Sequence, residues 1–600
     1  MRERPPRPQT SAPRRSAAPR STPLWRFALR VAASLAVMAA PGLAAALELG
    51  EIAIEGVDGA LAENIRARLS LANHPEDEPL TEARLSYLLR QAPGEVLTAL
   101  EPFGFYHAEL QVEPVRSGER VDVRIAVTRG APVRVRTQAI VLEGEGSGDP
   151  VLQRHRGNFR PAVGQVLDHR VYEQSKNELQ RELLARGYFD AEPGEQRVEV
   201  TRAEHAADIA LGWNTGARHA FGATRFVDSH IDEELLQRYV PWQPGQPFDH
   251  AQLVELHQAL TGLEYFGLVD IQPRPDAGDE GLVPVEVALT PAKRTLYTAG
   301  LSYGTDHGAA IELGMQRRYL NRAGHKLDID LAIGQRRSIG GVVYRIPATG
   351  GPKGWWSAGL NVREQEIAGF KRVEAAELVV GRNAEWKGYL AAAELHVLRE
   401  RFDDQQATVV FPQLHVGHSQ GDDPLYPRNG LGWSATARAG HSAFGSDADF
   451  AQLLGQVTWI RPLGASNRLL LRGAAGSSWI AQGDFAAFPP SLRFYAGGDR
   501  SVRGYGYQEL GPRDAEGRVI GGKHLLAGSA EVEHMFTEDW GIAGFVDAGD
   551  AFNDDFDARV GVGLGVRWRS PVGPVRVDVG VGLDDPERTV RLHLTIGPEL

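Results

Sequence analysis

The chain has 600 residues, no cysteine, and 77 acidic against 65 basic residues, a formal net charge of −12. This acidic balance disfavours a nucleic-acid partner, and the lack of cysteine excludes a disulfide scaffold and thiolate metal sites. The length suggests several domains, although a large barrel can form one domain by itself.

The first 46 residues have the pattern of a secretory signal. They contain eight arginines and one acidic residue, and a run of small apolar residues from Phe27 leads to Ala44-Ala45-Ala46. A basic segment, an apolar segment and an A-x-A site in this order predict a signal peptide over residues 1–46 that is cleaved. No later run approaches the 18 or more apolar residues of a membrane helix. A membrane-spanning region would therefore have to be a closed β-barrel.

Residues 47–292 repeat a unit about every 80 residues, which is typical of an array. Each unit contains a strand-like run, two helical segments, a glycine–aromatic turn and two closing strands. The glycines of the three turns are Gly104, Gly187 and Gly267. A strand, two helices and two strands make a small α+β domain with one helical layer on one sheet. We predict three such domains, at 47–129, 130–214 and 215–292.

The apolar periodicity of these units supports this prediction. In the first unit, leucines recur at helical steps between residues 85 and 100, and apolar residues alternate strictly with polar ones between 121 and 127. The open edges of such sheets can accept an extended polypeptide as an additional strand. The alternative is a string of spacers.

From residue 293 to the end, helical periodicity gives way to short segments that alternate apolar with small or polar residues, the signature of a membrane β-barrel. In the segment 560–569 the apolar residues are expected to face lipid, because Arg567 and Arg569 on the other face are tolerated only in a watery lumen. Eight of the eleven tryptophans lie in this half, as expected for interfacial girdles. About 300 residues, at roughly 18 to 20 per strand with its connection, predict an antiparallel barrel of about 16 strands.

A long connection over residues 482–523 separates two expected strands, and loops of this length are usually functional or disordered. It carries aromatic residues among glycines, in particular Phe494, Tyr495, Gly497, Gly498, Gly504 and Tyr505. Aromatic side chains on a segment with glycine hinges predict that the loop packs into another part of the structure. At its centre Arg503 presents a planar guanidinium, which suits bidentate contact with carboxylates. An ordinary extracellular loop with an incidental arginine is the alternative.

A candidate partner for Arg503 lies on a later strand, in the segment Gly544-Phe545-Val546-Asp547-Ala548-Gly549. Because Gly544 and Val546 are expected to face lipid, Phe545 and Asp547 should point into the lumen. A buried carboxylate there can meet a guanidinium away from bulk water, where removal of one partner is strongly destabilising. A solvated lumen acid is the alternative for Asp547 alone.

Together, the signal, the repeated units, the barrel and the loop resemble the superfamily of POTRA-barrel outer-membrane assembly and secretion proteins. In that superfamily the loop folds into the lumen and acids on neighbouring strands hold its arginine. The resemblance therefore implies a latch made by Arg503, Gly504, Tyr505, Asp547 and Glu531. It also implies that the loop packs in the lumen through Phe494, Tyr495, Gly497, Gly498, Phe545 and Gly549.

Three domains before the barrel look most like the TamA branch of this superfamily, the outer-membrane subunit of the translocation and assembly module. That resemblance implies a TamB-like periplasmic partner bound through the POTRA domains, and unfolded outer-membrane proteins, including autotransporters, as clients. It further implies a weakly paired lateral seam in the lipid bilayer, between Gly300 and Gly304 on the first strand and Leu592 and Leu594 on the last. A general barrel insertase and a two-partner-type secretion pore are the alternatives.

Two short patterns suggest enzymatic or metal chemistry. Residues 300–304 match G-x-S-x-G around Ser302, but a nucleophile elbow requires a strand-to-helix turn, and strand is expected on both sides. Several aspartates between 547 and 557 lack the spacing of a calcium-binding loop. We therefore expect no catalysis, no metal and no cofactor. An outer-membrane hydrolase is kept as the remaining alternative.

Overall fold

The computed structural model describes residues 47–75, 78–277, 281–306, 308–348, 354–386, 388–571 and 573–597. The predicted signal peptide, residues 1–46, lies outside the described residues. None of the helices in the described part of the chain is long and apolar enough to cross a membrane.

The first α+β unit is a three-stranded sheet with two helices. In chain order its elements are β1 (Glu48–Glu55), α1 (Gly59–Arg68), α2 (Glu82–Leu100), β2 (Glu109–Ser117) and β3 (Arg120–Thr128). Strand β3 lies in the centre, parallel to β1 and antiparallel to β2. The alternating valines and isoleucine of β3 and the leucines of α2 are buried together, so the two periodicities seen in the sequence meet in one core.

The next two units repeat this order of elements. The second contains β4 (Arg134–Glu143), α3 (Pro150–Gly157), α4 (His169–Ala185), β5 (Glu192–Thr201) and β6 (Ala206–Asn214). The third contains β7 (Ala220–Val227), α5 (Glu233–Gln237), α6 (His250–Gly262), β8 (Phe266–Pro273) and β9 (Leu282–Pro291). In each sheet the last strand of the unit is again central, with the orders β4-β6-β5 and β7-β9-β8. These are small α+β domains, as predicted, whereas the residues at which one domain ends and the next begins stay a prediction.

The glycine–aromatic turns have a packing role. At Gly187 the backbone is left-handed (φ +89°), and an added Cβ would lie 2.8 Å from Cβ of Phe248 in the third unit. At Gly104, also left-handed (φ +85°), it would lie 2.7 Å from the carbonyl oxygen of Leu167 in the second unit. Both glycines therefore lie at a close approach of the following unit, where a side chain would not fit.

A buried carboxylate links the second and third units. Asp149 accepts a hydrogen bond from the Val151 N–H at 2.8 Å, which caps α3, and ion pairs with Arg186 at 3.0 Å. Arg186 also contacts Asp249, the N-cap of α6, at 2.9 Å. Burial acts to raise the pKa of Asp149, but the Val151 N–H and the Arg186 guanidinium together lower this pKa below its usual value.

Replacing Arg186 with alanine is expected to lower the free energy of unfolding of these units by about 1–3 kcal/mol, because a buried carboxylate loses its charged donor. A carboxyl whose folded-state pKa is depressed stabilises the fold above its unfolded pKa of about 3.9, and this is lost as pH falls through the folded pKa. The difference between wild type and variant should therefore be constant above about pH 5 and shrink in more acidic solution.

Loss of helical circular dichroism in urea measures this effect in the full-length protein, since the α-helices described all lie before the barrel. Arg274→Ala is the matched control, because Arg274 is half-exposed and pairs with Glu286 at 3.4 Å on the surface. Equal urea midpoints for the two variants would show that the Asp149–Arg186 pair does not stabilise the joint.

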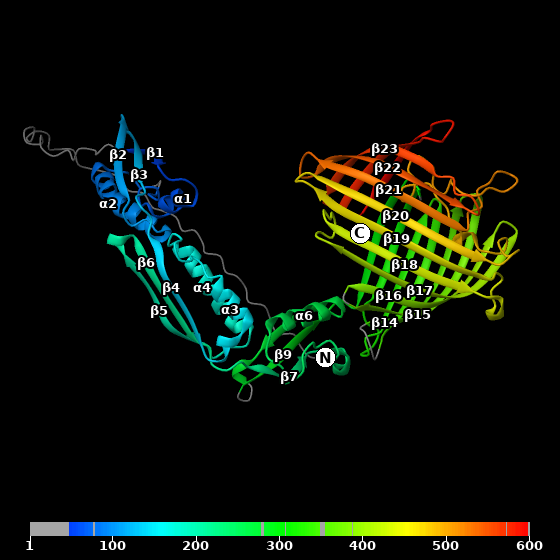
Figure 1. Cartoon of the computed structure of the whole chain (residues 1–600), viewed down its shortest axis with the longest axis horizontal. Coiled ribbons are helices and arrows are strands. Elements are labelled where there is room, and N and C mark those ends of the chain that lie inside the picture. The colour runs from blue at the N-terminus through cyan, green and yellow to red at the C-terminus, as the bar shows by residue number, and fades with distance from the viewer. Residues whose placement is uncertain are drawn as a thin grey trace, which may run out of the picture. The chain divides into compact units, whose positions relative to one another are not determined.

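The remainder of the chain forms one antiparallel sheet of 16 strands, as the sequence predicted. The strands are β10 (Thr295–Gly304), β11 (Gly308–Arg317), β12 (Lys326–Gly334), β13 (Arg337–Pro347), β14 (Gly354–Ile367), β15 (Phe370–Trp386), β16 (Tyr389–Phe402), β17 (Gln405–Gly421), β18 (Gly430–Gly440), β19 (Phe450–Leu463), β20 (Asn467–Ile480), β21 (His524–Met535), β22 (Trp540–Phe552), β23 (Arg559–Ser570), β24 (Gly573–Gly582) and β25 (Val590–Ile596). They follow one another in chain order around a nearly closed barrel (Figure 1).

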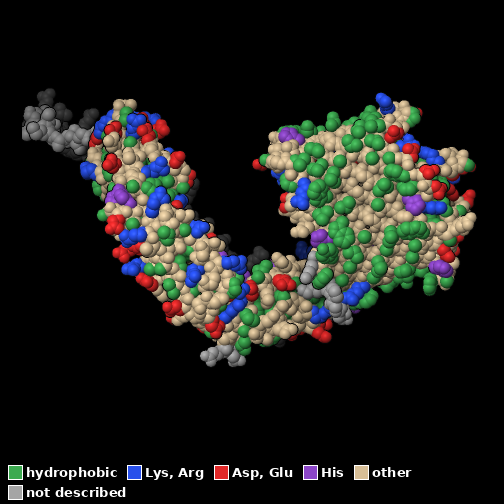
Figure 2. Space-filling model, viewed as in Figure 1, with side chains coloured by type: hydrophobic (Ala, Val, Ile, Leu, Met, Phe, Trp, Pro, Cys, Tyr) green, Lys and Arg blue, Asp and Glu red, His purple; other side chains and the backbone are tan. Residues whose placement is uncertain are grey.

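The outer surface of the barrel is apolar. On β23, Leu564 and Val566 are exposed, whereas the next residue, Arg567, is only 2% exposed, so the alternation places the charge in the lumen. Hydrophobic side chains cover much of the barrel wall, and charged side chains gather near the ends of its strands (Figure 2). The sheet begins at β10 and ends at β25, and no hydrogen-bonded ladder joins these two strands in the part of the chain that the structure describes.

Candidate functional site: a loop anchored in the barrel lumen

The connection from β20 to β21 is an ordered loop with its own backbone hydrogen bonds. Phe494 exchanges two backbone hydrogen bonds with Gly522, and Ala496 exchanges two with Leu510. The loop buries the aromatic rings of Phe494 and Tyr505, and Val502 is fully buried. The segment is therefore packed, and its central residues reach the inner face of the barrel wall.

The glycines of this loop allow close approaches of the chain to itself and to the wall. An added Cβ at Gly497 would lie 2.4 Å from the carbonyl oxygen of Gly506, and one at Gly498 would lie 2.8 Å from the Asp306 carboxylate. The ring of Phe494 lies over Gly476 of β20, where a Cβ would be 2.4 Å from a ring carbon. The half-buried Tyr495 directs its hydroxyl at the carbonyl oxygen of Pro490, 3.3 Å away.

Arg503 is 2% exposed and reaches three carboxylates. Its Nε and Nη2 donate to the two oxygens of Asp547 on β22 at 2.8 and 3.0 Å, a bidentate contact. Its Nη1 donates to Glu531 on β21 at 2.7 Å and to Asp578 on β24 at 2.9 Å. The Arg503 backbone N–H also donates to Asp547, at 3.0 Å. One loop residue therefore binds three strands of the wall.

A second arginine completes the network from the wall itself. Arg567 on β23 donates to Glu531 and to Asp578 at 2.6 Å each, so both acids are shared between the two guanidiniums. It also contacts Glu533 at 2.6 Å, which in turn pairs with Arg468 on β20 at 2.5 Å. Glu531, Glu533 and the two arginines are at most 3% exposed.

Aromatic rings cover the guanidiniums. The Arg503 Cζ lies 3.4 Å from the ring centroid of Phe545, and the Arg468 Cζ lies 3.5 Å from that of Tyr426. Cation–π contacts of this kind strengthen when water is excluded. Phe545 therefore does more than fill space, since its inward position on β22 places a ring directly against the loop arginine.

Glycines on β23 and β24 make room for the backbone of the loop. An added Cβ at Gly561 would lie 1.8 Å from the carbonyl oxygen of Arg503, and one at Gly580 would lie 2.8 Å from the Gly504 nitrogen. Gly504 itself has φ +98°, and a Cβ there would lie 2.6 Å from the Val581 carbonyl carbon. The backbone of the loop tip therefore lies directly against the barrel wall at Gly561 and Gly580.

Two further residues named from the sequence, Tyr505 and Gly549, also lie at the loop or the wall behind it. The Tyr505 ring rests on Gly582, where a Cβ would be 2.6 Å from the ring, and its hydroxyl accepts a hydrogen bond from the Asp584 N–H at 3.2 Å. At Gly549 on β22, a Cβ would lie 2.7 Å from the Cα of Ala527 on the adjacent strand. Gly549 therefore supports close packing of the wall rather than contact with the loop.

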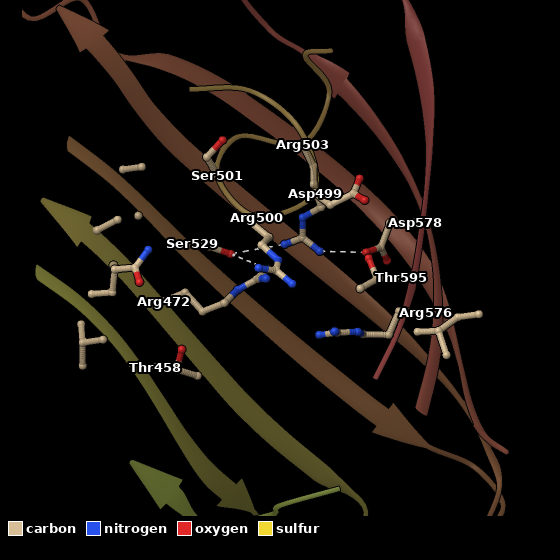
Figure 3. A pocket seen from close by; sticks show the side chains of 17 residues that line it. Thr458, Arg472, Asp499, Arg500, Ser501, Arg503, Ser529, Arg576, Asp578 and Thr595 are labelled. Carbon is tan, nitrogen blue, oxygen red and sulfur yellow. Dashed lines mark hydrogen bonds and ion pairs between the residues drawn. The ribbon is translucent and has the colours of Figure 1, made fainter. Parts of the chain in front are cut away.

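A cavity of about 360 Å³ adjoins the loop tip. Figure 3 shows Arg472, Arg503 and Arg576 directed toward this cavity from different segments, with Ser529 and Asp578 between them. The Ser529 hydroxyl accepts from Arg503 and Arg472, both at 3.3 Å. The lumen beside the latch is thus strongly polar.

The predicted seam residues lie at the two ends of the sheet. Gly300 lies within β10 and Gly304 ends that strand. On β25, Leu592 is 57% exposed toward the lipid side, whereas Leu594 is half-buried. The Leu594 N–H donates to the Thr305 hydroxyl at 3.3 Å, across the boundary between the first and last strands.

The two patterns considered for enzymatic or metal chemistry have structural explanations. Ser302 lies inside β10, with strand on both sides, and its hydroxyl donates to Glu312 at 2.7 Å. Beyond β22, the Asp557 N–H donates to Asp550, and the Asp557 carboxylate pairs with Arg559 at 2.5 Å. These contacts describe a lumen hydrogen bond and a charged turn.

Sequence reasoning missed five charged members of the network, namely Arg468, Arg472, Glu533, Arg567 and Asp578. The signal for Arg567 and Asp578 was present, because strand alternation placed both on the lumen face of adjacent strands. The alternation of β21 likewise places Glu533 on the same face as Glu531. Which lumen charges meet the loop depends on strand register and loop path, which the pattern of a single strand does not contain.

Three α+β units, a sixteen-stranded barrel and a lumen loop held by buried ion pairs define the class of POTRA-barrel outer-membrane proteins. The comparisons agree with this class. The Omp85 superfamily domain matches residues 357–599, and POTRA domain 1 of the TamA type matches residues 51–129. Residues 357–599 thus carry an Omp85 superfamily domain, and in that superfamily the barrel lies in the outer membrane and the POTRA domains lie in the periplasm.

Curated relatives and a solved structure are similar to the chain at low identity. The outer membrane protein assembly factor BamA of Nitratidesulfovibrio vulgaris is 24% identical over 428 residues, covering 66% of this chain and 53% of the relative. The outer envelope protein 80 of Arabidopsis thaliana is 22% identical over 501 residues, 73% of this chain and 64% of the relative. The chain thus spans between half and two thirds of these relatives.

Among solved structures, BamA from Haemophilus ducreyi lacking POTRA domains 1–3 has the same fold. Its TM-score is 0.54 at 13% identity, and the match covers 92% of this chain and 99% of that structure.

Proposed function

We propose that this protein is an assembly factor that inserts or translocates autotransporter-type and other β-barrel proteins at the outer membrane. One observation carries the proposal: the described sheet runs from β10 to β25 without a ladder between these two strands. Unpaired edge strands accept additional strands. In the bilayer, such an edge offers a client strand its backbone partners at the lipid boundary.

The buried latch fits this role. Its ion pairs hold the loop against β21, β22 and β24, next to the last strand, and involve no reacting group. We infer a mechanical role for the chain, in which Arg503, Asp547 and Glu531 keep the loop in a defined position. A catalytic role for Ser302 has no support from its place inside β10.

We propose that the periplasmic partner is a TamB-like protein bound through the POTRA domains. The match of residues 51–129 to a TamA-type POTRA domain supports this choice over a general insertase. Affinity capture from envelope extract with the full-length protein tests it: a large inner-membrane-anchored protein should be retained. Retention of small lipoproteins instead would favour the general insertase. Retention of a single secreted substrate would favour the two-partner-type pore.

A disulfide across the seam tests lateral opening. The chain has no cysteine, so a pair introduced in β10 and β25 is the only pair present. In proteoliposomes, the oxidised protein is expected to lose assembly of an autotransporter barrel, and reduction should restore it. A disulfide between Leu313→Cys and Leu331→Cys is the matched control, because these residues are already opposite each other on β11 and β12. Full assembly by the oxidised seam variant would refute lateral opening.

A further inference from the structure

The turn of the loop just before Arg503 lies between the two edges of the barrel seam. The Asp499 carboxylate accepts from the His593 Nδ1 of β25 at 2.5 Å and from the Thr305 hydroxyl, just beyond β10, at 3.3 Å. The Asp499 backbone N–H donates to Asp306 in the same β10–β11 turn, at 3.1 Å. One loop residue therefore contacts the first hairpin and the last strand together.

His593 is held from both of its ring nitrogens. The Gly504 N–H donates to Nε2 at 3.2 Å, so Nε2 is the acceptor and Nδ1 carries the proton donated to Asp499. The ring is 4% exposed. His593 therefore attaches the last strand to two loop residues, Asp499 and Gly504, and Arg591 of the same strand also pairs with Glu509 of the loop at 2.8 Å.

These contacts lie where the backbone ladder of the barrel stops. Across the seam, the Leu594 N–H donates to the Thr305 hydroxyl at 3.3 Å. This hydroxyl in turn donates to the Asp499 carboxylate. A hydroxyl that bridges a carboxylate on the loop and an amide on β25 links the three segments into one network. Charge-assisted bonds of this kind are about twice as strong as neutral ones.

We propose that Asp499, Thr305 and His593 form a clasp by which the lumen loop holds the seam closed, so that seam opening requires the loop turn to withdraw. The clasp is distinct from the Arg503 ion pairs, which join the loop to β21, β22 and β24 and involve neither edge strand. This inference rests on the proposed function, because the seam is where clients would enter. In this proposal, Asp499 controls the opening of the seam.

Asp499 also occupies a position from which it can leave. Gly498 precedes it with φ +101°, a backbone conformation that side chains disfavour. The following residue, Arg500, is exposed, and the turn borders the cavity beside the latch. Withdrawal of this turn would break the contacts of Asp499 to His593 and Thr305, while the Arg503 ion pairs remain in place.

Distance measurements between spin labels on the two seam strands test the clasp in the full-length protein in lipid nanodiscs. Tyr303→Cys on β10 and Leu592→Cys on β25 place the labels on side chains exposed to lipid. Asp499→Ala is expected to raise the fraction of molecules with longer label distances at least about tenfold, because the hydrogen bonds of the carboxylate to His593 and to Thr305 are both lost. Thr305→Val, which removes only the bridging hydroxyl, should give a smaller change in the same direction.

Arg500→Ala is the matched control and should leave the distances unchanged. Heat-modifiable migration in electrophoresis shows that each barrel is folded; if Asp499→Ala does not fold, Thr305→Val carries the test. Unchanged distances in folded Asp499→Ala and Thr305→Val proteins would overturn the clasp. Client assembly is measured separately. Longer label distances without any change in assembly would support the clasp and would show that client assembly does not depend on the seam.

Discussion

Replacing Arg503 with alanine is expected to release the loop from the barrel wall. The change leaves Asp547 buried without its bidentate partner and removes one of the two guanidiniums that Glu531 and Asp578 share. Loss of one partner from a buried ion pair costs about 3–5 kcal/mol. Because the barrel wall keeps its ladder, the cost should appear mainly as unseating of the loop and only partly as loss of the barrel.

Protease cleavage within residues 482–523, in the intact protein in lipid, measures this release. We expect the variant to be cut at least tenfold faster than wild type while the barrel keeps its heat-modifiable migration, and client assembly to fall with loop seating. Arg503→Lys should recover little, since an ammonium cannot reproduce the planar fork that binds Asp547. Arg513→Ala, on the exposed part of the same loop, is the control. A loop that stays protected in Arg503→Ala would show that the ion pairs do not hold it.

Replacing Gly561 with alanine is expected to unseat the same loop while every charge is retained. The added methyl group would lie 1.8 Å from the Arg503 carbonyl oxygen, far inside contact distance, and the two nearest atoms are backbone. The backbone of Gly561 does not need a glycine conformation, because its φ is not positive. The substitution therefore acts through the approach of the loop and leaves the strand intact.

The matched control for this substitution is Gly528→Ala on β21, where the added Cβ has its nearest neighbour at 3.8 Å. Both variants are compared by protease cleavage of the loop and by the spin-label distances across the seam. We expect Gly561→Ala to reproduce the loop exposure of Arg503→Ala, and Gly528→Ala to behave as wild type. If Gly561→Ala kept the loop protected, the close approach of loop and wall would not be required for seating.

Much of the architecture was predictable because it depends on local periodicity. Alternation over segments of about ten residues assigns each side chain to lipid or lumen without knowledge of any other strand. This is why Phe545 and Asp547 were expected to face inward, and both are buried there. The repeated order of strands and helices before residue 293 is equally local, and the structure has the same order of elements in all three units.

The composition of the loop network was only partly predictable. The motif around Arg503 pointed to Asp547 and Glu531, and the structure brings both within hydrogen-bond distance. Arg567 was expected on the lumen face, but neither it nor Asp578 could be connected to the loop. Their contact depends on the register between β21 and β24 and on the glycines that let the loop backbone lie on the wall.

The sequence by itself determined the class of fold, the direction in which the strand residues point, and the arginine on which the loop depends. Only the tertiary structure decided that Asp499 and His593 meet, because they lie 94 residues apart on a loop and an edge strand. Their contact exists because the barrel brings its first and last strands to one boundary and the loop folds back to that place. Local patterns specify which face a residue occupies, whereas closure of the sheet decides which residues become neighbours.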